Sequence, residues 1–205
     1  MTTGLRRFRA PLPPTPRVER CEMCARTLFA GHPHVVDTEN RGLLCACPDC
    51  ASLFALEGAA GGRYRRVPDR HLRAAGFALT DADWDALQIP VRMAFLFRNS
   101  ALGRTVAFYP SPAGATESLL DVDSWDRVLA ANPHLPPPAD DVEAVLVRRE
   151  PAGTECYLVP IDACYRLVGL VRTHWKGFDG GTEAWAAIDT FFEDLRARSR
   201  VVGTG

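Results

Sequence analysis

The sequence of 205 residues has no long apolar run, since no stretch approaches the roughly 18 consecutive apolar residues that a membrane helix needs. The beginning of the chain also lacks the apolar segment of a signal peptide. Arg6 and Arg7 resemble the start of a twin-arginine signal, but four prolines between residues 11 and 16 stand where its apolar run would be. We therefore expect a cytoplasmic protein without membrane insertion.

An excess of charge of one sign is lacking as well. The formal net charge is −1, whereas a general nucleic-acid binder normally carries a clustered basic excess. About half of the residues are hydrophobic (47%) and a quarter are charged (24%), which is typical of a chain with a packed core. The composition therefore predicts protein partners rather than nucleic acid.

Catalytic signatures are absent too, because the chain contains no GxSxG, HExxH or GxGxxG pattern and no GxxxxGK[ST] phosphate loop. The most distinctive segment outside the cysteines is residues 109–118, in which small hydroxylated residues follow a predicted strand. This pattern is more typical of an ordered turn than of an anion site. We predict no catalytic or cofactor-binding residue, and an enzyme that uses the segment stays an alternative.

Cysteine is abundant, with seven residues in the chain and five of them between positions 21 and 50. In a reducing compartment such cysteines serve as metal ligands rather than as disulfides. Cys21-x-x-Cys24 and Cys47-x-x-Cys50 are separated by 22 residues, which is typical of a zinc ribbon. Two tight turns can then direct four thiolates at one tetrahedral ion, so we predict Cys21, Cys24, Cys47 and Cys50 as ligands of Zn²⁺.

Three further residues are reserve ligands. Cys45 competes with Cys47 for a place in the second pair, although the CxxC spacing favours Cys47 and leaves Cys45 as a small buried hydrophobic residue. His32 and His34, with Asp37 nearby, raise the alternative of a second metal site, since imidazole binds zinc, iron and nickel well. Two histidines around a proline are nevertheless more typical of an exposed loop.

Iron is the alternative metal, because four thiolates also build a one-iron electron carrier of the rubredoxin type. The second cysteine pair is similar to a rubredoxin loop. Ala25 and Ala51, however, stand where such loops usually carry glycine, and this departure favours zinc.

The pattern along the chain predicts five segments, of which two are folded. Strands are expected at 93–97, 104–109, 142–147 and 156–159, and helices at 161–175 and 182–195. We predict an α+β fold in which a small zinc-ribbon-like module precedes an antiparallel four-stranded sheet packed on two C-terminal helices. The expected segments are a flexible basic arm (1–19), the zinc-knuckle module (20–57), a linker (58–79), the α+β domain (80–199) and a disordered tail (200–205).

Seven segments together resemble a bacterial family of unknown function, mainly actinobacterial, whose genes lie beside those of nickel–iron hydrogenases. The resemblance extends from about Arg20 to Ser199, and it implies the metal residues Cys21, Cys24, Cys45, Cys47 and Cys50 without deciding which four bind. The segments are ERCEMCARTL, HPHVVD, LLCACPDCASLF, RVPDRHL, IPVRMAFLF, VAFYPSPAGATESLLD and YRLVGLVRTHWKGFDGG.

The resulting hypothesis is a non-catalytic, zinc-binding accessory protein for nickel–iron hydrogenase maturation or assembly. Hydrogenase subunits or maturation factors are the partners that the resemblance implies. A rubredoxin-like electron carrier and an enzyme using residues 109–118 remain as alternatives.

Overall fold

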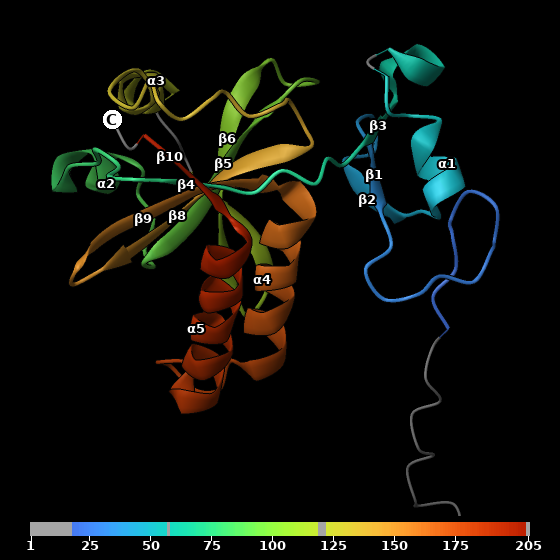
Figure 1. The fold of residues 1–205 in the computed structure, drawn as a ribbon. Helices are drawn as coiled ribbons and strands as arrows, with labels where there is room; N and C mark the ends of the chain where they lie inside the picture. The colour runs from blue at the N-terminus through green and yellow to red at the C-terminus, as the bar shows by residue number, and fades with distance from the viewer. Residues whose placement is uncertain (1–17, 57, 119–121, 204–205) are drawn as a thin grey trace, which may run out of the picture.

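The computed structural model describes residues 18–56, 58–118 and 122–203, which form a small module (residues 18–67) beside a larger body (residues 68–203) (Figure 1). The predicted basic arm therefore lies outside the described residues, apart from positions 18 and 19. The elements, in chain order, are β1 (His34–Asp37), β2 (Gly42–Cys45), α1 (Pro48–Ser52), the short 3-10 helix η2 (Ala59–Gly62), β3 (Tyr64–Arg66), β4 (Leu72–Ala74), α2 (Asp81–Ala86), β5 (Met93–Asn99), β6 (Arg104–Ser111), β7 (Gly114–Ser118), α3 (Val122–Ala130), β8 (Glu143–Glu150), β9 (Gly153–Pro160), α4 (Ile161–His174), α5 (Gly181–Arg198) and β10 (Arg200–Val202).

The module contains a three-stranded antiparallel sheet in the order β2-β1-β3. Its central strand has two adjacent valines, and a strand directs successive side chains to opposite faces. Val35 is fully buried among the cysteines of the module, while Val36 packs into the core of the body. The central strand therefore joins the two parts of the molecule.

The body is built on a seven-stranded sheet in the order β10-β4-β9-β8-β5-β6-β7. All neighbouring strands are antiparallel except β10 and β4, which are parallel and bring the end of the described chain beside residues that follow the module. The predicted hairpins β5–β6 and β8–β9 are both confirmed.

Alternating side chains bury both faces of the large sheet. Phe95, Leu146 and Tyr157 form one cross-strand row, which packs against α4 and α5. Leu96, Val145 and Leu158 form the adjacent row, which packs with Trp84 of α2 and Trp125 of α3. Figure 1 shows α4 and α5 side by side along the sheet.

The predicted four-stranded antiparallel sheet on two helices is wrong. The structure has seven strands in a mixed sheet, a second sheet of three strands in the module, and helices against both faces of the larger sheet. The missed strands β4 and β10 have only three residues each, which is too short for an alternating pattern to show. The missed strand β7 is Gly114–Ser118, whose small polar residues are typical of a turn.

Two segments predicted to be irregular contain strands. The expected linker, 58–79, includes β3 of the module sheet and β4 of the body sheet. The expected disordered tail begins with β10, which pairs with β4 through Arg200↔Leu72. In the described part of the chain, no helix combines the length and the apolar character that a membrane crossing requires.

Candidate metal centre

The first CxxC pair lies on a tight turn that its own backbone closes. Cys21 donates its N–H to the Arg26 carbonyl (2.8 Å) and accepts the N–H of Ala25 (2.8 Å). Ala25 has a φ of 61°, in the left-handed region that favours glycine. The turn thus adopts a glycine-type conformation with alanine, so the alanine at position 25 does not by itself favour zinc over iron.

The second CxxC pair lies at the start of helix α1. Cys47 is its N-cap in extended conformation, and Pro48 follows at the first helical position, where the missing N–H costs nothing. The Cys47 Sγ accepts the N–H of Cys50 at 3.5 Å, so the sulfur takes the place of a serine hydroxyl as the cap. Ala51 lies inside this helix and needs no glycine conformation.

The two turns bring all four predicted sulfur ligands together. The Sγ atoms of Cys21, Cys24, Cys47 and Cys50 lie within 4.8 Å of one another, and those of Cys24 and Cys47 are 3.8 Å apart. Four sulfurs at about 2.3 Å from a tetrahedral ion are about 3.8 Å from each other. The cluster is therefore close enough to bind a metal ion.

Contacts around the cluster hold the two turns against each other. Glu22 donates its N–H to the Cys45 carbonyl (2.9 Å), and its carboxylate accepts the N–H of Cys45 (2.5 Å). An exposed ion pair between Arg26 and Asp49 also joins the first turn to the second. The surrounding core is small and consists of Cys21, Leu28, Val35, Ala46, Cys47 and Ala51.

The pKa values differ strongly between two of the thiols. Burial raises the pKa of Cys21, but backbone N–H groups, chiefly that of Cys47, outweigh it and lower the pKa to about 6. Hydrogen bonds from the Cys50 thiol to the sulfurs of Cys24 and Cys47 raise the pKa of Cys50 to about 12. Thiols that share protons in this way can bind a cation in their place, because metal binding releases the protons of the cysteine ligands.

Cys45 lies outside the four-cysteine cluster and belongs to a second group. Its Sγ lies within 4.8 Å of ring nitrogens of His32 and His34, the two reserve histidines. Burial and the nearby carboxylates of Glu22 and Glu19 raise the pKa of this thiol. The histidines are not in an exposed loop, since both are half-buried.

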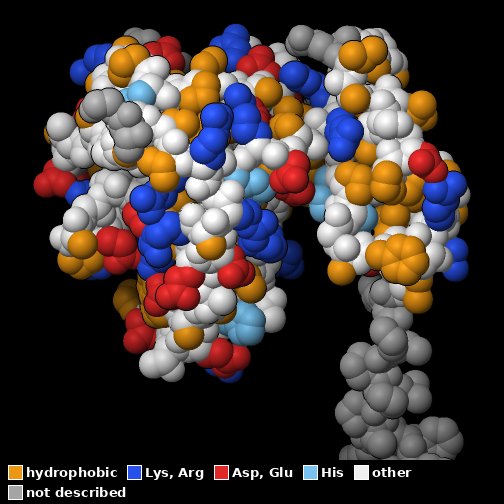
Figure 2. Space-filling model, viewed as in Figure 1, with side chains coloured by type: hydrophobic (Ala, Val, Ile, Leu, Met, Phe, Trp, Pro, Cys, Tyr) orange, Lys and Arg blue, Asp and Glu red, His pale blue; other side chains and the backbone are white. Residues whose placement is uncertain are grey.

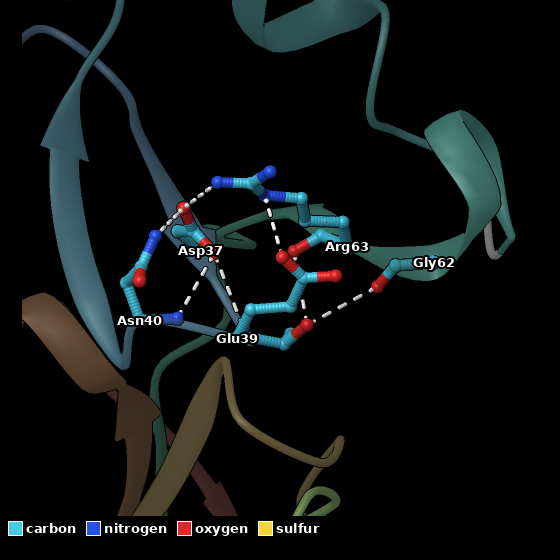
Figure 3. Close-up of polar contacts among 6 residues, drawn as sticks. Asp37, Glu39, Asn40, Gly62 and Arg63 are labelled. Carbon is cyan, nitrogen blue, oxygen red and sulfur yellow. Dashed lines mark hydrogen bonds and ion pairs between the residues drawn. The ribbon is translucent and has the colours of Figure 1, made fainter.

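Asp37, which the sequence placed near these histidines, has another role (Figure 3). Its carboxylate accepts the backbone N–H groups of Glu39 and Asn40, the Asn40 side-chain amide (2.8 Å) and the Arg63 guanidinium (3.0 Å). The hydrogen bond from Arg63 is the main reason that the pKa of Asp37 falls to about 2. This network fixes the β1–β2 turn to the segment before β3.

Residues 109–118 form a hairpin rather than an open loop. Tyr109 to Ser111 end β6, and Gly114 starts β7. The Ser111 hydroxyl lies 3.0 Å from both the Gly114 carbonyl and the Thr116 hydroxyl. The hydroxyl groups therefore hydrogen-bond within the hairpin.

The remaining thiols, Cys156 and Cys164, are fully buried in the two cores of the body. Burial raises the pKa of both. They act as small apolar side chains.

Fold and site together define a two-part protein in which a four-cysteine module is attached to a mixed-sheet body. The chain belongs to DUF5947, a family of unknown function whose pattern matches residues 20–199. No curated protein and no solved structure matches the chain.

Proposed function

We propose that this protein is a non-catalytic, zinc-binding accessory protein of nickel–iron hydrogenase maturation or assembly. The observation that carries the metal part of the proposal is the convergence of four cysteine sulfurs in a module with very little core of its own. Metal binding free energy can hold such a module together, as it does in zinc fingers.

Zinc is the favoured ion because the site is made of four thiolates and no open position is needed. Sulfur spacing does not separate zinc from iron, since both accept four thiolates in a tetrahedron. The second turn leads directly into α1, so that Cys47 caps a helix and Ala51 is helical. That helix is the feature that argues against a pair of rubredoxin-type loops.

Exposed apolar side chains support a docking role for the module. Eight large hydrophobic side chains are exposed among the described residues, and four of them belong to the module although it is the smaller part: Val18, Phe29, Leu53 and Leu56. Figure 2 shows hydrophobic groups across the visible surface of the module. Such side chains are typical of a protein-binding surface.

The hydrogenase assignment rests on the family resemblance described above. A small zinc module with exposed apolar side chains, joined to a larger body, suits a factor that binds another protein during assembly. The partners in this proposal are hydrogenase subunits or maturation factors.

Metal analysis of protein purified from its native host tests the first half of the proposal. We expect at least one zinc per chain that resists dialysis, and no visible absorption from iron–thiolate charge transfer. A red protein with full iron occupancy and a reversible one-electron reduction would instead establish the electron carrier.

Gene replacement tests the second half. Deleting the gene is expected to lower hydrogenase activity and leave an immature subunit while the structural genes are still transcribed. A variant combining Phe29→Ser, Leu53→Ser and Leu56→Ser should keep its zinc but fail to restore maturation. Phe178→Ser, at a fully exposed phenylalanine of the body, is the matched control and should restore maturation. Normal maturation in the deletion strain would refute the assignment.

A further inference from the structure

The group formed by His32, His34 and Cys45 is assembled by the β1–β2 hairpin. His34 and Cys45 are directly opposite each other in the register, so their side chains share one face. His32 precedes His34 by two residues, and the two rings are 4.9 Å apart between centroids. One ligand atom from each of the three residues lies within 4.8 Å of the others.

Both imidazoles are oriented in the way that metal-binding histidines are. Nδ1 of His32 is 3.0 Å from the Phe29 carbonyl oxygen, and Nδ1 of His34 is 2.9 Å from an Asp162 carboxylate oxygen. Because both oxygens are acceptors, each Nδ1 carries a proton, and in the neutral ring Nε2 then presents its lone pair. A ligating histidine usually donates its second N–H to a carbonyl or carboxylate, as both do here.

The free nitrogen of His32 is the strongest single observation. The His32 side chain is only 9% exposed, and its Nε2 is buried without a hydrogen-bond partner. A buried nitrogen left in this state costs free energy, because it has given up its hydrogen bonds to water without replacing them. A metal ion held with His34 and Cys45 would supply the missing partner.

We propose that His32, His34 and Cys45 form a second metal site, distinct from the four-cysteine site, for a divalent late transition ion such as Zn²⁺, Co²⁺ or Ni²⁺. Two imidazoles and one thiolate are the donors that such ions prefer. Three protein ligands leave a fourth position for an exogenous ligand, whereas four cysteines close the other site. The second site is therefore the one at which an ion could also bind an exogenous ligand.

The surroundings give the fourth ligand access. His32 and His34 line a cleft of about 740 Å³ between the module and the body, together with Arg66, Asp162 and Arg166. Asp162 lies in the first turn of α4, so the orienting carboxylate comes from the body while the ligands come from the module. Asp162 is thus a positioning residue, and through its contact with His34 it couples metal binding at this site to the packing of the module against the body.

Titration of the full-length protein, carrying one equivalent of zinc, with Co²⁺ tests this site. We expect one further equivalent to bind, with d–d absorption and a charge-transfer band of a single thiolate. Azide should shift the d–d bands because the fourth position is open. Binding of no second equivalent by the wild-type protein would overturn the proposal.

Variants distinguish a built site from adventitious binding. His32→Ala and Cys45→Ser should each lose the Co²⁺ equivalent and keep the zinc, and Asp162→Asn should weaken Co²⁺ binding by about 10- to 100-fold. His174→Ala, which removes a half-buried histidine paired with Glu183 in the body, is the control and should bind as the wild type does. Full Co²⁺ binding by His32→Ala and Cys45→Ser would refute the site. Loss of zinc from both variants would show instead that these residues only support the four-cysteine site.

Discussion

The module and the body are stabilised by different means. The module has a cluster of six buried residues, of which two are cysteines and two are alanines. The body has clusters of sixteen and nineteen buried residues that include large aromatic side chains, and Val36 and Val67 of the module pack into the larger one. Apolar burial contributes about 25 cal/mol per Å², so the two larger clusters stabilise the body more than the small cluster stabilises the module. The smaller core of the module stabilises it less, and we expect a metal ion at the four-cysteine site to supply the missing stability.

Cys47→Ser is the change expected to have the largest effect, and it should act on the module alone. Serine caps a helix at least as well as cysteine does, so α1 keeps its N-cap while the metal loses a ligand. We expect loss of the zinc and loss of hydrogen-exchange protection in residues 34–45, with the body unchanged. Cys45→Ser is the control and should keep the four-cysteine metal. The reverse result would show that the thiols are paired differently.

Phe192→Ala should destabilise the body and leave the module unchanged. Phe192 is fully buried beneath Tyr157 and Arg148, so its removal should lower the free energy of unfolding of the body by about 3–5 kcal/mol. Zinc content should stay at the wild-type level. Denaturant unfolding followed by tryptophan fluorescence measures the first effect, because all four tryptophans lie in the body. Loss of zinc from this variant would contradict the separation of the two parts.

Asp37→Asn probes the polar part of the module. The substitution keeps the shape of the side chain but removes the charge that binds Arg63. We expect amide exchange at Glu39 and Asn40 to become faster by about tenfold. Glu39→Gln alters an exposed partner of the same Arg63 and should change exchange much less. Equal effects of the two substitutions would argue against Asp37 as the centre of the network.

Thr80→Ala should have the smallest effect, confined to the body. Thr80 and Asp83 form a capping box at the start of α2, and the threonine hydroxyl is the main reason that the pKa of Asp83 lies below its ordinary value of 3.8. The loss of a cap costs about 1 kcal/mol near pH 7.

The pH dependence of this cost has a defined sign. The folded pKa of Asp83 is depressed, so the carboxylate contributes stability above pH 3.8, and this contribution disappears as the pH falls through the lower folded value. The difference in the free energy of unfolding between the wild type and Thr80→Ala should therefore become smaller below pH 3.8. Thr173→Ala, at an exposed threonine inside α4, should show no such narrowing.

Elements with a strong local pattern could be predicted from the sequence. The β5–β6 and β8–β9 hairpins carry branched and aromatic residues, and α4 and α5 carry apolar residues at helical spacing, so their local signals agree with the fold. Strands β4 and β10 could not be predicted in this way. They are three residues long, and they become strands by pairing with each other and with β9 across long distances in sequence.

The candidate site was predictable where spacing alone decides the geometry. A CxxC turn presents two sulfurs to one side, so the four cysteines could be named in advance. The association of Cys45 with His32 and His34 depends on the register His34↔Cys45, which no local spacing shows. The His-x-His spacing was the available signal, because alternate residues of an extended segment share a face.

Hydrogen exchange of the wild-type protein with and without a strong chelator tests the central claim most directly. We expect chelation to release zinc and to remove protection from the module strands β1 and β2, while the amides of β5, β8 and β9 stay protected. Retained protection of β1 and β2 in metal-free protein would contradict the claim that the four-cysteine metal holds the module together.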